Sequence, residues 1–297
     1  MFSSAENERR LRLLSEKYPF VQLRTLTVTP GNRPLTALRI GEGSHRVLIS
    51  AAHHANEWIT AVMLLQFLES YAAAVAQGGQ LAGENATALA AGSTLWAVPL
   101  VNPDGVDLVT GAATPDEVAA AKALAESYPD IPFPEGWKAD LLGVDLNLQY
   151  PAGWLQAREI KYMQGFDRPG PRDYVGPYPL SQRESRALAE FTEEVDPALV
   201  LAYHTQGQEI YWQFEDIFVP GARELGEEFA ALSGYRLADT PYNSSFAGYK
   251  DWFIKRFRRP GYTIEAGIGE NPLPISQLPE IYEANLPLLV RSLQKKM

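Results

Sequence analysis

The stretch Arg46–Ala52 (RVLISAA) is a nearly continuous apolar run of strand length. Such a run predicts a strand that is buried on both faces of a sheet. The polar residues 53–58 (HHANEW) follow it directly, and a helical pattern then runs from Ile59 to Ala74. A strand, a short polar loop and a helix place the side chains of the loop in the crevice at the carboxyl end of an α/β sheet. The sequence therefore predicts an α/β fold with a functional site after this strand.

Three later segments repeat this design: Leu95–Val101, which ends in a turn at residues 102–105, Ala198–Tyr203, which ends at His204, and Gly261–Glu265. Two alternating segments, 21–28 and 35–40, are separated by the turn residues 30–34 and predict a hairpin. We expect one α/β domain over residues 1–297, with a mixed central β-sheet flanked by helices.

Helical patterns occupy most of the remaining chain, at residues 4–18, 115–127, 181–194, 221–233 and 277–295. The helix at 181 opens with Ser181 and Glu184, which is the signature of a capping box. The segment 151–179 is rich in Pro, Gly and Tyr and is too long for a simple connection. It is typical of a functional surface loop.

Composition excludes several classes of function. The chain has 26 basic and 36 acidic side chains and a formal net charge of −10, which opposes binding to nucleic acid or to an anionic membrane. It has no cysteine, so a metal would need nitrogen and oxygen ligands.

No apolar run approaches the ~18 residues of a membrane span. Charges in the first 18 residues replace the apolar core of a signal peptide. We therefore expect a cytoplasmic protein, although a processed secreted form would leave the same sequence. The sequence does not indicate an oligomeric state.

The chain contains only four histidines, and the positions of two of them suggest a metal site. A lone histidine usually has a structural role. Here His54 and Glu57 follow one buried strand, and His204 follows another. Two nitrogens and one carboxylate, with a fourth position left to water, form the ligand set of a catalytic zinc site. Glu265, at the end of a further strand, is placed to deprotonate that water.

At these residues the chain resembles the zinc carboxypeptidase family over nearly its whole length. Five motifs occur in the family's order: residues 54–58 (HANEW), 102–105 (NPDG), 143–147 (GVDLN), His204 after a strand, and 263–265 (TIE). The resemblance implies a metallocarboxypeptidase-like fold and a zinc peptidase that holds one Zn²⁺ per chain. It assigns His54, Glu57 and His204 as the ligands and Glu265 as the general base.

The resemblance also implies roles around the metal. Asp145 matches the carboxylate that accepts a hydrogen bond from the ring of the first ligand, and an aspartate that stabilises its loop is the alternative. Lys138 falls where the family keeps an arginine that stabilises the oxyanion, and a plain surface lysine is the alternative. Tyr242 matches a substrate-contacting tyrosine, with a packing role as its alternative. We interpret His53 as structural, because two neighbouring residues of an extended chain do not face the same side.

One departure from the family concerns the substrate. Carboxypeptidases bind a terminal carboxylate through an Asn-Arg pair, but this chain has Asn147 and Leu148. Leucine cannot form the charge-assisted bonds of arginine. Residues 143–152 instead resemble the γ-D-glutamyl-L-diamino acid endopeptidases, which cut peptidoglycan stem peptides. Lys250 aligns with the position that in carboxypeptidases lies at the floor of the specificity pocket. A lysine there would suit the second carboxylate of diaminopimelate; a lysine reaching solvent from a helix is the alternative.

Two other functions stay open from the sequence. One is a zinc carboxypeptidase that acts on ordinary peptides, and Leu148 argues against it. The other is an inactive zinc-containing module that binds peptides, and the retention of Glu265 argues against it. In each case the expected partner is a muropeptide or another peptide.

Overall fold

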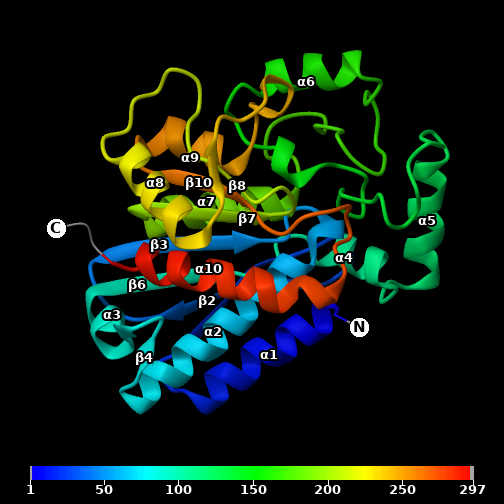
Figure 1. Cartoon of the computed structure of the whole chain (residues 1–297). Helices are drawn as coiled ribbons and strands as arrows, with labels where there is room; N and C mark the ends of the chain where they lie inside the picture. The colour runs from blue at the N-terminus through cyan, green and yellow to red at the C-terminus, as the bar shows by residue number, and fades with distance from the viewer. Residues whose placement is uncertain (1, 295–297) are drawn as a thin grey trace.

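Eight strands form the central sheet of the computed structural model, which describes residues 2–294 (Figure 1). The order across the sheet is β1-β2-β6-β3-β7-β10-β8-β9, and β4 and β5 form a separate two-stranded sheet. The strands are β1 (Gln22–Val28), β2 (Pro34–Ile40), β3 (His45–Ala51), β4 (Gln80–Leu81), β5 (Glu84–Asn85), β6 (Ser93–Val98), β7 (Leu199–His204), β8 (Glu209–Tyr211), β9 (Arg236–Ala238) and β10 (Gly261–Glu265). The expected mixed α/β architecture is confirmed.

Pairing in the sheet follows the predictions. β1 and β2 pair antiparallel, which confirms the hairpin. β6, β3, β7 and β10 form the parallel centre of the sheet. Along β3, Val47 and Ile49 face one hydrophobic core while Leu48 faces the other. This alternation explains why the strand is apolar at successive positions.

Ten α-helices surround this sheet within residues 2–294. They are α1 (Ser4–Lys17), α2 (Ile59–Gln77), α3 (Ala86–Gly92), α4 (Pro103–Thr110), α5 (Pro115–Ala125), α6 (Trp154–Met163), α7 (Arg183–Val195), α8 (Ala222–Ser233), α9 (Tyr249–Phe257) and α10 (Leu278–Ser292). Helices α1, α2 and α10 pack together along one side of the sheet (Figure 1), and α7 and α9 contribute to the core on the opposite face. The carboxyl ends of β3, β7 and β10 therefore emerge between two helical layers.

Two local predictions are wrong. Residues 102–105 are not a separate turn: Asn102 caps α4, its side-chain oxygen accepting a bond of 2.9 Å from the Gly105 amide, and the helix begins at Pro103. Ser181 and Glu184 do not form a capping box, because α7 begins at Arg183 and the Ser181 hydroxyl donates to the Gln149 side chain at 2.9 Å. Glu184 is fully buried instead. Tertiary contacts have overridden the local pattern at this position.

Other segments differ from expectation in extent. The predicted loop 151–179 contains helix α6. The last helix ends at Ser292, and its predicted end at Lys295 lies outside the described residues. Within residues 2–294, α2 is the one helix long and apolar enough to span a membrane, so the expectation that no segment approaches that length is wrong. Most of α2 is buried, including Met63, Phe67 and Tyr71, and it serves as a core helix.

Candidate active site

Three neighbouring parallel strands deliver the predicted site residues to one edge of the sheet. His54 follows β3, Glu57 lies in a 3₁₀ turn (Ala55–Glu57) just beyond it, and His204 is the last residue of β7. Glu265 ends β10 and is the direct register partner of His204. Residues that are 211 positions apart in sequence (54 and 265) thus meet, because parallel strands end at a common edge.

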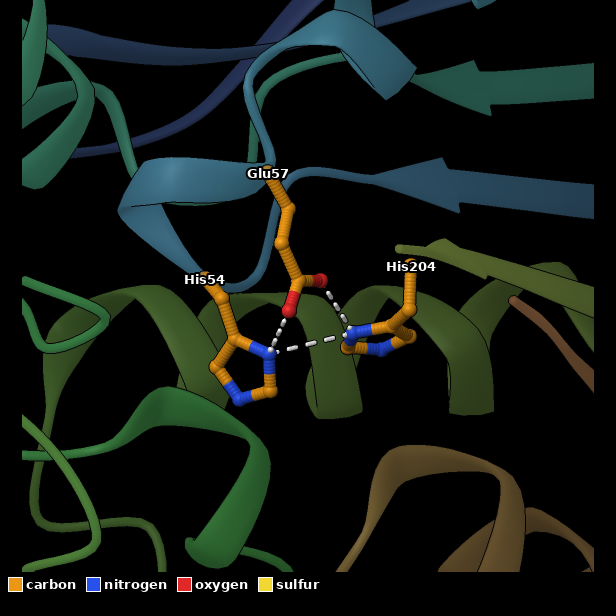
Figure 2. A group of neighbouring side chains, drawn as sticks. All are labelled: His54, Glu57 and His204. Atoms are coloured by element: carbon orange, nitrogen blue, oxygen red, sulfur yellow. Dashed lines mark hydrogen bonds and ion pairs between the residues drawn. The ribbon is translucent and has the colours of Figure 1, made fainter. Parts of the chain in front are cut away.

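The side chains of His54, Glu57 and His204 converge (Figure 2). Nδ1 of His54 lies 3.0 Å from Glu57 Oε1, and Nδ1 of His204 lies 2.9 Å from Glu57 Oε2. The two ring nitrogens are 3.2 Å apart. One candidate ligand atom from each residue fits within 4.8 Å of the others, as binding of one ion requires.

The chemistry of this group fits zinc. Two imidazole nitrogens and a carboxylate are the ligand set that zinc accepts in catalytic sites. Nε2 of His204 is buried and has no hydrogen-bond partner within residues 2–294, so the polar contacts of this ring are made through Nδ1. A cation between the Nδ1 atoms would satisfy lone pairs that otherwise face each other.

Asp145 holds the ring of His54 from the other side. Its Oδ1 lies 3.0 Å from His54 Nε2, which leaves Nδ1 directed at Glu57 and His204. Burial alone would raise the pKa of Asp145, but His54 and Lys138 outweigh it and hold that pKa well below its usual range. A charged Asp145 favours the tautomer with the proton on Nε2.

His53 packs beside this group but makes its hydrogen bond elsewhere. Its Nε2 lies 3.1 Å from the Tyr150 hydroxyl, and its ring stacks on that of His204 at a centroid distance of 5.6 Å. Burial holds the pKa of His53 well below its usual value, with the nearby histidines adding to the effect, so the ring is neutral. The geometry agrees with a structural interpretation of His53.

Glu265 and Lys138 line the same cavity as the candidate ligands. Burial raises the pKa of Glu265 to about 8, with the charge of Glu57 adding to the effect. Lys138 Nζ lies 2.9 Å from Glu57 Oε1. Burial lowers the pKa of Lys138, but the negative charge of Glu57 outweighs it, and the ammonium stays charged.

Two of the three predicted substrate-binding residues line the cavity, and one does not. Asn147 lines the cavity and its carboxamide oxygen accepts a bond of 3.0 Å from the Tyr249 amide. Lys250 also lines the cavity, but Nζ donates to the Gln213 carbonyl at 2.6 Å and lies 2.5 Å from Asp251 Oδ1. Tyr242 is 70% exposed, packs edge-on against Phe246 and is not among the residues that line the cavity. The structure therefore does not bring Tyr242 to the site.

Sequence reasoning missed several polar residues of the cavity wall, among them Lys161, Arg172, Asp173 and Tyr211. The first three lie in the segment 151–179, whose length and composition already suggested a functional surface. That signal pointed to the segment but not to particular residues.

Comparisons with known proteins agree with this geometry. Residues 8–288 match the family model described as zinc carboxypeptidase. The chain is 41% identical over 283 residues to gamma-D-glutamyl-L-diamino acid endopeptidase 1 of Lysinibacillus sphaericus, covering 95% of this chain and 70% of the relative.

Two solved structures share the fold. Bovine thrombin-activatable fibrinolysis inhibitor has a TM-score of 0.74 at 18% identity, covering 98% of this chain and 96% of that one. The murein-tripeptide amidase MpaA of Escherichia coli O157 has a TM-score of 0.58 at 20% identity, covering 93% of each chain. The chain belongs to the zinc carboxypeptidase family and is a zinc metallopeptidase.

Proposed function

We propose that this enzyme hydrolyses the amide between the γ-carboxyl of D-glutamate and the diamino acid of peptidoglycan stem peptides. The observation that carries the proposal is the 41% identity, over 95% of the chain, to a relative named for this activity. Leu148 supports it. This side chain lines the cavity beside Asn147 and packs with Trp154 and Val175 in an apolar cluster. An apolar wall at this point cannot pair with the terminal α-carboxylate of an ordinary peptide.

In the proposed mechanism, His54, Glu57 and His204 hold the zinc. When bound, zinc supplies Lewis-acid activation of the scissile carbonyl and lowers the pKa of water. Glu265 takes the proton from the attacking water and later returns it to the amine that leaves as the C–N bond breaks. Glu265 lines the cavity together with the three candidate ligands, as this role requires.

Lys138 is proposed to stabilise the carbonyl oxygen as it becomes negative. Its ammonium has three donors, and one contact with Glu57 leaves two for the substrate. A preorganised cation of this kind contributes on the order of 3 kcal/mol to transition-state stabilisation. Asp145 keeps the His54 ring oriented during the cycle.

A direct assay tests the proposed substrate. Zinc-loaded protein is offered L-Ala-γ-D-Glu-diaminopimelate, the isomer linked through the α-carboxyl of glutamate, and a benzoylglycyl amino acid, with products separated by mass. We expect L-Ala-D-Glu and free diaminopimelate from the γ-linked peptide and poor turnover of the other two. As a control, Glu265→Gln keeps the ligand set but should lower kcat by at least ~10²-fold. Release of the amino acid from the benzoylglycyl peptide, with the γ-linkage intact, would overturn the proposal.

A further inference from the structure

Two cations and one carboxylate form a small charged group on the wall of the cavity. Lys161 comes from α6, and Arg172 and Asp173 come from the loop between α6 and α7. Asp173 lies between the cations: its Oδ1 is 2.6 Å from Lys161 Nζ and its Oδ2 is 2.6 Å from Arg172 Nε. These three side chains carry one more positive than negative charge, and the neighbouring Asp145 is paired with the His54 ring.

The other lysines of the cavity are balanced. Lys250 is paired with Asp251 and also donates to a backbone carbonyl. Lys138 is paired with Glu57. In the part of the chain that the structure describes, the group of Lys161, Arg172 and Asp173 is thus the place on the cavity wall where cations outnumber their paired carboxylates. An anionic part of a substrate would be attracted there.

Arg172 is the member that a ligand can reach. Its side chain is 38% exposed, whereas those of Lys161 and Asp173 are 11% and 13% exposed. Its hydrogen bond to Asp173 uses Nε, and neither Nη atom bonds to any residue between 2 and 294. The outer edge of a guanidinium carries parallel N–H groups that match the two oxygens of a carboxylate.

The backbone around Arg172 is fixed to the catalytic segment. The Pro171 carbonyl accepts bonds from the amides of Lys138 at 2.7 Å and Ala139 at 2.9 Å. On the other side, the Asp173 amide donates to Asp145 Oδ2 at 3.3 Å. Arg172 is therefore held between the segment that carries Lys138 and the carboxylate that orients His54. A cation held in place in this way loses little conformational entropy when it binds a ligand.

We propose that Arg172 binds a carboxylate of the substrate, and that Asp173 and Lys161 act as positioning residues for it. The inference rests on the proposed function, since a γ-D-glutamyl-diaminopimelate peptide carries free carboxylates on the D-glutamate α-carbon and on the far end of the diamino acid. Arg172 would then bind a substrate carboxylate from a different segment of the chain than the one that carries Leu148.

The test compares substrates that differ by one carboxylate. Wild type, Arg172→Gln and Arg172→Lys are assayed on L-Ala-γ-D-Glu-diaminopimelate, on the same peptide with the glutamate α-carboxylate converted to a carboxamide, and on the peptide with the side-chain carboxylate of diaminopimelate amidated. Arg168→Gln is the matched control, because Arg168 lies in the same loop but pairs with Asp167 away from the cavity. Zinc content is measured for every variant, since a loss of folding would also remove the metal.

We expect Arg172→Gln to lower kcat/KM for the parent peptide by about 10- to 100-fold, mainly through KM, as loss of a charge-assisted bond predicts. One of the two amidated peptides should be nearly insensitive to the substitution, and that peptide identifies the bound carboxylate. Arg172→Lys should recover part of the loss. Equal losses on all three peptides, or no loss, would overturn the inference while leaving the γ-D-glutamyl activity in place. If wild type cleaves only the benzoylglycyl peptide, the proposed function fails, and the same comparison with its terminal carboxamide then decides the role of Arg172.

Discussion

Asp140 and Asp145 are five positions apart, and both are buried, but their surroundings differ. Asp145 faces the His54 ring and accepts the amide of Asn147 at 3.0 Å. Asp140 accepts the amides of Leu142 and Val144 through Oδ1, while its Oδ2 is buried without a partner within residues 2–294. Its ionisable neighbour is Glu184, whose two oxygens also have no partner in that range.

The difference determines the charge of each carboxyl. For Asp145, neighbouring cations outweigh burial, and its pKa falls below its usual range. For Asp140, burial raises the pKa well above its usual value and the charge of Glu184 adds to the increase. A buried carboxylate stays ionised where cations surround it and takes up a proton where it meets another carboxyl. Asp145 can thus stay anionic beside the candidate metal ligands. Asp140 and Glu184 are kept neutral, although Asp140 is only five positions away from Asp145 in the sequence.

The largest expected effect follows from removing a ligand on the charged side of this comparison. His204→Ala deletes one of three proposed ligands, so we expect zinc to be lost. Loss of Lewis-acid activation worth several kcal/mol would reduce kcat/KM by more than about 10³-fold. Metal analysis and peptide cleavage measure both results. His53→Gln, which changes the neighbouring stack but not the ligand set, should keep its zinc; full zinc occupancy in His204→Ala would remove that residue from the metal site.

A smaller effect is expected from neutralising Asp145. Asp145→Asn keeps the shape of the side chain but removes the charge that favours the proton on His54 Nε2, so zinc affinity should fall by about 10- to 100-fold. Competition with a chelator measures this affinity. Asp140→Asn is the matched control and should leave zinc affinity unchanged. Equal affinities in the two variants would contradict the distinction between the two aspartates.

The residues of the candidate metal site could be predicted from the sequence, because they lie at the ends of strands that the sequence pattern identifies. β3, β7 and β10 are apolar on both faces, and each is followed or closed by a polar residue: His54, His204 or Glu265. Parallel strands leave this pattern wherever they bring a site to a common edge. The position of Asp145 required the family resemblance, because its loop has no periodicity of its own.

The remaining features depend on tertiary contacts that local patterns do not encode. Lys250 lines the cavity, but no local pattern indicates that its ammonium donates to the carbonyl of Gln213, 37 residues away. Arg172 reaches the cavity because its loop is bonded to Lys138 and Asp145. Glu184 has the spacing of a capping residue from Ser181, yet the helix begins two residues later and buries it. For Lys250 and Arg172 a long-range contact, absent from any sequence window, decides what the side chain does.

The protonation of the buried Glu184 can be tested through the pH dependence of the free energy of unfolding. Burial, with the charge of Asp104 adding to it, raises the pKa of Glu184 from its usual 4.5 to about 7. Between these values the folded chain keeps a proton that the unfolded chain releases, so the stabilising contribution is complete below pH 4.5 and is lost as pH rises to 7. Above pH 7 the ionised group destabilises the fold by about 3 kcal/mol. Glu184→Gln stays neutral throughout and avoids this loss.

We therefore expect the free energy of unfolding of Glu184→Gln, relative to wild type, to be higher at pH 8 than at pH 5 by on the order of 2 kcal/mol. Urea unfolding with a chelator present measures it without a contribution from zinc binding. The comparison between pH values removes the fixed cost of burying an amide in place of a carboxyl. Glu190→Gln, on the exposed face of the same helix, should show no such difference between the two pH values. If the relative stability of Glu184→Gln is the same at pH 5 and pH 8, the carboxyl is ionised in the fold and a cation or another partner must accompany it.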